Sequence, residues 1–163
     1  MNEPPVYRAP MRSRCESVPE GAAVERALRL GLCGMGGSLD IAPSALGVAL
    51  LAVDARFGER TARRIERFAS APDGAFVWTR DIDALTWLGR LTGPWRYDPS
   101  LEAAHVDLVH VRSCEWIRDP VHPALIPDGV GASFGRGGRN WQRIGAPDVP
   151  GLTAALWDQL RDA

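Results

Sequence analysis

The residue types that most often carry out catalysis are few in this sequence and poorly spaced for it. His105, His110 and His122 are five and twelve residues apart, which matches no zinc-binding pattern. Cys114 follows His110 by four residues, but on a strand this spacing separates the side chains by roughly 13 Å, too far for a nucleophile and its base. The glycine-rich segment GLCGMGGS, residues 31–38, lacks the Lys-Ser/Thr ending of a phosphate loop. We therefore predict no enzyme, no metal site and no cofactor.

Aromatic rings and arginines are instead concentrated in the second half of the chain. Aromatic faces stack on bases, and arginines bind phosphates or guanine edges, so this combination is typical of nucleic-acid recognition. The competing interpretation is that tryptophans of a β-rich domain lie in its core, as we expect for Trp116 and Trp157. The candidate nucleic-acid-binding residues are Trp78, Arg80, Trp87, Trp95, Arg96, Tyr97, Arg136, Arg139, Trp141 and Arg143.

The composition restricts the kind of partner. The 163 residues suit one domain with a hydrophobic core, and the formal net charge of -1 means that any anion must be bound by a local patch. All 19 basic residues are arginines, which bond bidentately and stack on rings better than lysine does. Three widely spaced cysteines suit free thiols in a reducing compartment. Without a signal-peptide core or an apolar run of membrane-spanning length, we expect a cytoplasmic protein that does not enter membranes.

The elements that must position these residues follow from apolar spacing and from glycine and proline breaks. Residues 1–17, rich in proline, are expected to form an irregular N-terminal arm, and residues 18–163 a single domain. Helices are predicted over 18–31, 43–56, 59–69 and 150–160, and strands over 32–35, 75–80, 86–92, 106–116 and the end of 135–144. This order predicts an α+β fold with a small, strongly curved sheet or barrel flanked by helices.

Several short motifs accompany this order of helices and strands. A helix ends in Arg67-Phe68, Asp73-Gly74 precedes a strand, and further matching positions are Gly89, Gly93, Trp95, Tyr97, Glu115 and Trp116. Over residues 24–144 this pattern resembles the PUA-like superfamily, particularly the EVE-like domains at the N-termini of modification-dependent restriction enzymes. The resemblance implies a barrel-like sheet with an aromatic pocket for a flipped, often modified base, and basic loops that hold the backbone. Relatives often have a tryptophan where this chain has Gly36-Gly37-Ser38, so the resemblance implies either that one wall of the pocket is missing or that another residue, such as Trp78, supplies it.

These observations together predict a non-catalytic reader of nucleic acid, with DNA that carries a modified base as the expected partner. Trp78, Trp87, Trp95 and Tyr97 are the expected pocket walls, and the arginines of the candidate set the backbone contacts. The resemblance places such a reader in restriction or defence, where a separate nuclease or effector protein would supply any cutting. Two alternatives remain open at this point, namely a protein-interaction or small-ligand module on the same fold and an RNA-binding PUA-like domain.

Overall fold

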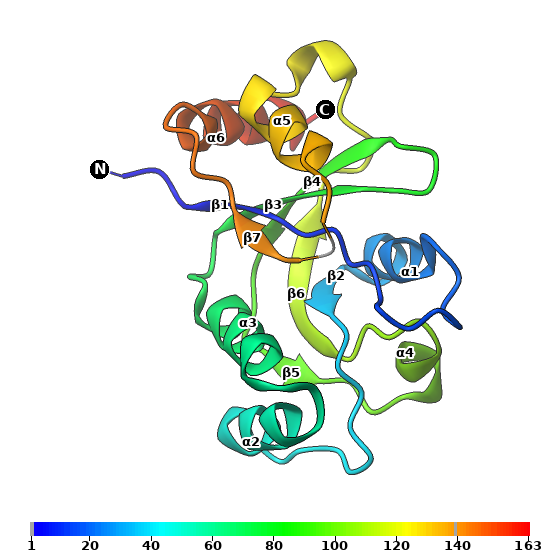
Figure 1. Ribbon diagram of the computed structural model, residues 1–163. Helices are drawn as coiled ribbons and strands as arrows, with labels where there is room; N and C mark the ends of the chain where they lie inside the picture. The colour runs from blue at the N-terminus through cyan, green and yellow to red at the C-terminus, as the bar shows by residue number, and fades with distance from the viewer. Residues whose placement is uncertain (1, 139) are drawn as a thin grey trace.

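The computed structural model describes residues 2–138 and 140–163 as one strongly curled, half-barrel sheet flanked by helices (Figure 1). The elements in chain order are β1 Val6–Arg8, α1 Ala22–Leu30, β2 Leu32–Met35, α2 Leu46–Phe57, α3 Glu59–Ser70, β3 Phe76–Arg80, β4 Thr86–Leu91, β5 Arg96–Tyr97, α4 Leu101–His105, β6 His110–Trp116, the 3-10 turn Pro123–Leu125, α5 Asp128–Gly135, β7 Gln142–Arg143 and α6 Val149–Leu160. The predicted α+β class and curved sheet are confirmed. None of the described helices is long and apolar enough to cross a membrane.

The sheet is mixed and bends most along β6. Its strand order is β2-β6-β4-β3-β1-β7, with β1 parallel to β3 and the other described pairs antiparallel. The first half of β6 pairs with both β2 and β5, whereas its last residues pair with β4. One strand thus belongs to two differently oriented parts of the sheet, which gives the curl visible in Figure 1.

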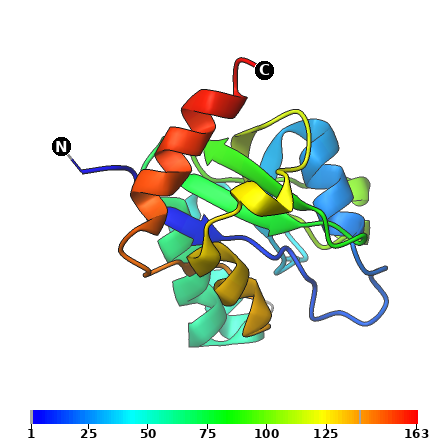
Figure 2. The same ribbon diagram turned by 90° about the horizontal axis from the view of Figure 1, so that it is seen from above.

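Helices cover both faces of the central strands. Val77 and Leu91 pack in one buried cluster with residues of α1. Trp78 and Leu88, which point the opposite way, pack in a second cluster with Trp157 of α6, the helix that Figure 2 shows lying across the sheet. A strand buried on both faces is expected to be apolar throughout, and the sequence of β3 begins Phe-Val-Trp.

Helices α2 and α3 form a hairpin on a third, smaller cluster made by Val53, Ala62 and Ile65. Gly58 connects the two helices with a φ of +99°, a conformation that favours glycine. Helix α3 is strongly amphipathic, as its sequence predicts, with its arginines outside and Ile65 and Phe68 buried. This hairpin forms one side of the site described below.

The N-terminal arm differs from the prediction in one segment. Val6–Arg8 forms strand β1 between β3 and β7, and Val6 and Arg8 are buried. Only three residues long, this strand is stabilised by backbone pairing with residues about 70 and 135 positions away, which local spacing cannot reveal. The predicted strand over 106–116 is also shorter than expected, because residues 106–109 form a turn and a connection after helix α4.

Candidate nucleic-acid interface

Trp78 lies in the core and not at a surface. Its side chain is fully buried in strand β3, and its Nε1–H donates to Thr153 Oγ1 of α6 at 3.3 Å. A base could reach this ring only if α6 left the sheet. We therefore withdraw Trp78 from the candidate site, and with it the expectation that Trp78 replaces the missing wall at residues 36–38.

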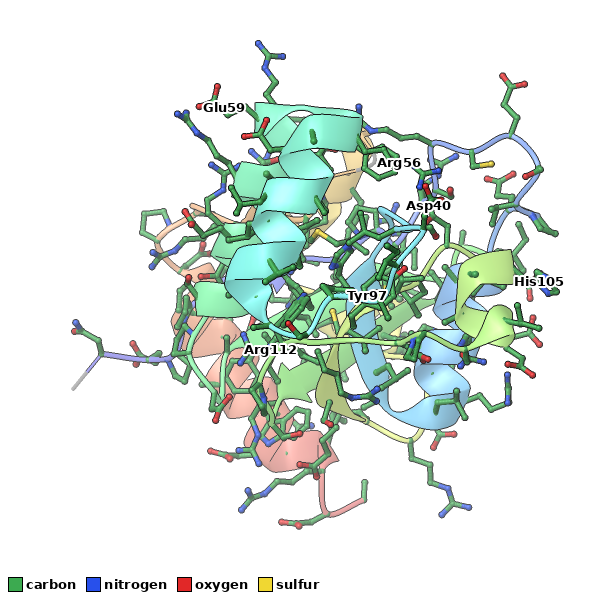
Figure 3. All side chains as sticks on the ribbon, turned by 90° about the horizontal axis from the view of Figure 1, so that it is seen from below. Asp40, Arg56, Glu59, Tyr97, His105 and Arg112 are labelled. Atoms are coloured by element: carbon green, nitrogen blue, oxygen red, sulfur yellow. The ribbon has the colours of Figure 1, made fainter. Side chains whose placement is uncertain are left out.

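The rings between residues 87 and 97 are half-buried, and their polar atoms bind other parts of the protein. Trp87 Nε1–H donates to Asp81 Oδ2 at 2.9 Å, and Trp95 Nε1–H donates to His110 Nδ1 at 3.3 Å. The Tyr97 hydroxyl accepts from the Leu39 amide at 2.9 Å, where it holds the segment before α2 (Figure 3). Arg96 between them is exposed. These hydrogen bonds hold the rings against other parts of the protein and so fix local structure.

His110 is buried and contacts two of these rings, Trp95 and Tyr97. Its Nδ1 accepts from Trp95, so its Nε2–H donates to the Gly37 carbonyl at 3.0 Å. Burial lowers the pKa of His110 below its ordinary 6.5, against the opposing effects of the Gly37 hydrogen bond and of Asp107. The imidazole is therefore neutral and structural near neutral pH.

The aromatic group that the structure does assemble includes one predicted residue and two that sequence reasoning missed. Tyr7 stacks on Trp141 with ring centroids 4.0 Å apart and planes at 14°, and Phe68 meets Trp141 edge-on at 5.6 Å. Trp141 is 7% exposed, and its Nε1–H has no partner among the described residues. Tyr7 was missed because its segment carried no sign of a strand.

A hollow of about 110 Å³ lies beside Trp141, and we call it the Trp141 hollow. On the same measure one water molecule needs roughly 10–15 Å³, so the space admits a small ring system or several waters. Its walls come from five separate parts of the chain. They include Arg12, Ser13, Arg14, Met35, Gly36, Gly37, Phe57, Thr61, Arg64, Asp107, Asn140 and Trp141.

Asp107 closes one side of the Trp141 hollow against the glycine segment. Its Oδ1 accepts from the Gly37 amide at 3.1 Å and from Ser38 Oγ at 3.4 Å, and its Oδ2 accepts from Ser13 Oγ at 2.7 Å. A Cβ atom at Gly36 would overlap this carboxylate, so the close approach requires glycine there. The glycine segment therefore serves close packing at the hollow and not a phosphate loop.

The arginines around the Trp141 hollow form a local positive patch on a chain of nearly neutral net charge. Arg14 donates to Asn140 Oδ1 at 3.0 Å. Burial lowers the pKa of Arg64, and the neighbouring positive charges of Arg14, Arg67 and Arg60 lower it further. Like charges held this close favour a bound anion.

The basic loop that follows α5 borders the Trp141 hollow through Asn140 and Trp141, and strand β1 holds this loop in place. Arg8 Nη1 donates to the carbonyls of Ser133 at 2.6 Å and Gly137 at 3.0 Å, and Nη2 donates to Gln142 Oε1 at 3.0 Å. The loop's own candidates, Arg136 and Arg143, are exposed, and Arg139 lies outside the described residues.

Arg80 lies apart from Trp141. Its guanidinium is 4.8 Å from the centre of the Phe134 ring, and it borders a different hollow. Of the ten sequence candidates, the Trp141 hollow thus contains Trp141 alone, beside the loop that carries Arg136 and Arg143. Sequence reasoning missed Tyr7, Arg12, Arg14, Arg64 and Asp107, which long-range pairing brings together.

Within the described residues no group of three or more His, Cys, Asp or Glu side chains is arranged to hold a metal ion. Cys33 and Cys114 are buried, and burial raises the pKa of the Cys33 thiol to about 12. Neither the protein-family models nor the curated proteins gave a match to this sequence.

Proposed function

We propose that this chain is a non-catalytic nucleic-acid-binding protein whose Trp141 hollow receives a nucleobase. The observation that carries the proposal is the combination in one hollow of an indole, a carboxylate and three arginines, Arg12, Arg14 and Arg64. Flat bases are bound by aromatic contact and by hydrogen bonds to their edges, and the strand that carries them is bound through its phosphates.

The polar groups favour a base that carries an amino group. A carboxylate accepts about four hydrogen bonds, and Asp107 accepts three within the protein, from Gly37, Ser38 and Ser13. Counting the described residues, one acceptor position is left for an N–H donor, such as the exocyclic amine of adenine or cytosine. We retain DNA with a modified base as the proposed partner, and RNA is the alternative that the test must separate.

The test compares two neighbouring arginines of α3. Arg64 borders the hollow, whereas Arg63 forms an exposed ion pair with Glu59 and does not. We expect Arg64→Gln to weaken oligonucleotide binding and to reduce the slope of log affinity against log salt by about 1, because one phosphate contact is lost. Arg63→Gln should leave both unchanged.

Fluorescence anisotropy with plain DNA, methylated DNA and matched RNA, each single- and double-stranded, supplies the readout. Preference for one modified DNA supports the proposed reader, and preference for RNA supports the alternative. Failure of every oligonucleotide to bind at low salt, or equal binding by the two variants, would overturn the proposal.

A second candidate function, a protein-interaction module, is favoured by helix α2. This helix is apolar on most of its surface, yet Leu51 is 77% exposed and Val48 is 50% exposed. Such a face is typical of a covered interface, and a second copy of the chain is the simplest partner because two like faces cover each other. Sedimentation velocity should then show a dimer that Leu51→Glu dissociates and that Leu101→Glu, a change at a similarly exposed leucine of α4, leaves intact.

A further inference from the structure

A second hollow, of about 190 Å³, lies between the end of β1, the start of α1, the β3–β4 turn and the loop after α5. We call it the Arg80 hollow. Three arginines border it, namely Arg8, Arg12 and Arg80. It shares Arg12 with the Trp141 hollow, and the same loop contributes Gly137 and Gly138 to one hollow and Asn140 and Trp141 to the other.

Arg8 is a buried charge that has no counter-charge among the described residues. Its side chain is 4% exposed, and its hydrogen bonds with the described residues go to carbonyl oxygens and to the neutral amide of Gln142. No carboxylate of the described residues contacts it, and its Nε–H has no partner there. Burial lowers the pKa of Arg8, and the positive charge of Arg136 lowers it further. A buried charge in this condition is costly until an anion approaches it.

Arg80, at the border of the same hollow, likewise has no counter-charge among the described residues. It lies on the Phe134 ring, and within the described part of the chain its buried Nε–H has no partner and its guanidinium forms no ion pair. Arg80 is only partly buried, so its guanidinium can contact a ligand directly. Stacking on a ring holds a guanidinium in place and leaves its in-plane donors free.

The two carboxylates that border the Arg80 hollow are already occupied. Glu20 pairs with Arg12 at 3.3 Å. Asp81 accepts from the amides of Asp83 at 2.9 Å and Leu85 at 3.0 Å, and from Trp87 Nε1 at 2.9 Å. Neither carboxylate forms an ion pair with Arg8 or Arg80, and although Asp81 keeps its negative charge, three arginines against two carboxylates leave the described lining with an excess of positive charge.

We propose that the Arg80 hollow is a phosphate-binding site, in which Arg80 makes the direct contacts and Arg8 supplies the buried charge. A planar guanidinium binds two oxygens of a phosphate at once, and a partly enclosed site strengthens this attraction. The site is separate from the base-binding proposal except in the origin of the phosphate, which is either a free phosphate compound or the backbone of a bound strand.

The first experiment measures the thermal stabilisation of the full chain by inorganic phosphate against chloride at equal ionic strength. A ligand that binds only the folded chain raises its melting temperature. Arg80→Gln should abolish the phosphate-dependent rise. The matched control is Arg90→Gln, because Arg90 also lies over an aromatic ring, that of Trp157, but pairs with Glu115 and does not border the hollow.

Each outcome is decisive, because the readout is the change on adding phosphate and not the absolute stability of a variant. A rise in the wild type and Arg90→Gln that is absent in Arg80→Gln supports the site. No rise in the wild type, or an equal rise in Arg80→Gln, overturns it. Arg80→Lys keeps the charge without the fork and should retain a smaller rise.

The second experiment identifies the source of the phosphate. If it belongs to a bound strand, Arg80→Gln weakens oligonucleotide binding by about tenfold and inorganic phosphate competes with the oligonucleotide. If it belongs to a small compound, oligonucleotide binding is unchanged while the phosphate response is lost. Should no oligonucleotide bind at all, the base-binding proposal fails, and the phosphate response still tests this site on its own.

Discussion

Two buried arginines hold distant parts of this chain together, and they differ in how completely they are satisfied. Arg112 of β6 is 2% exposed and lies inside the fold beneath the α2–α3 hairpin (Figure 3). Its Nε donates to Gly93 O at 2.7 Å, Nη1 donates to Phe68 O at 2.9 Å and Ala71 O at 2.6 Å, and Nη2 donates to Asp73 Oδ1 at 2.9 Å. These hydrogen bonds cap the carboxyl end of α3, and Asp73 supplies one counter-charge.

Arg8 of β1 also makes four hydrogen bonds with the described residues, but these bonds are weaker. Its contacts extend to 3.4 Å at Asn140 O, all its acceptors are neutral, and its Nε–H is unpaired within the residues described. It holds the loop that borders both hollows, whereas Arg112 holds a helix end that borders neither.

This difference distinguishes an arginine that only stabilises the fold from one that is available to bind an anion. Where every guanidinium nitrogen has an acceptor and the charge has a counter-charge inside the protein, as at Arg112, the side chain has little to offer a ligand. Where the charge is buried and unmatched, the folded state retains an electrostatic cost that only an anion can relieve. Burial alone, which is almost the same for both, does not distinguish them.

The largest expected effect is that of Arg112→Ala. Three carbonyls would lose their partner and a cavity would replace the guanidinium, so we expect a loss of about 3–5 kcal/mol in the free energy of unfolding. Arg112→Met should cost nearly as much, because it fills the space but leaves the carbonyls unpaired. Urea denaturation measures both variants, and a loss below about 1 kcal/mol would contradict the structural role.

Arg8→Ala should destabilise the protein less, by about 1–3 kcal/mol, because removing an unmatched charge offsets part of the lost hydrogen bonding. Its main effect should be local. Freed from Arg8, the segment between α5 and β7, residues 136–141, should open, and trypsin should cleave after Arg136 faster than in the wild type. Equal cleavage of wild type and variant would show that Arg8 does not hold the loop.

Local sequence signals predicted the elements that local physics determines. Gly31, with a φ of +69°, ends α1 where expected, and the spacing in α3 correctly identified its buried Ile65 and Phe68. The uninterrupted apolar run at the start of β3 is typical of a strand covered on both faces, so that signal could have placed Trp78 in the core.

The site could be predicted only in part, because its residues come together through contacts far apart in sequence. Trp141 was predicted from its own aromatic and basic neighbourhood. Tyr7 reaches Trp141 because β1 pairs with β7. Asp107 lies in a turn, has a φ of +52° itself, and accepts a hydrogen bond from the glycine segment at Gly37. No spacing within one segment indicates either contact.

A pH dependence sharpens the contrast, because the region around Arg112 also contains the buried His110. The folded chain holds His110 neutral and lowers its pKa below the ordinary 6.5, chiefly by burial. Below that ordinary value the unfolded chain binds a proton that the folded chain does not, so stability falls as the pH drops from about 6.5 towards the lower pKa of the folded state. The slope from one group is at most roughly 1.4 kcal/mol per pH unit.

Urea denaturation at a series of pH values between about 7.5 and 5 measures how the free energy of unfolding changes with pH. The control is His110→Gln, which cannot titrate and should lose the His110 contribution to the slope even if it is less stable at every pH. An unchanged slope in the variant would show that other groups, such as exposed carboxylates, cause the acid sensitivity.

The smallest expected effect is that of Asp73→Asn, which tests how much the Asp73 counter-charge of Arg112 contributes to stability. The Asp73 side chain is 68% exposed, and exposed ion pairs contribute about 0–1 kcal/mol because water screens them. Arg112 would keep its three carbonyl acceptors, so the loss should be under about 1 kcal/mol by the same denaturation. If Asp73→Asn instead costs as much as Arg112→Ala, the counter-charge dominates and the carbonyls contribute little. The absence of a described carboxylate at Arg8 would then explain the whole difference between the two arginines, and it would strengthen the reason for an anion in the Arg80 hollow.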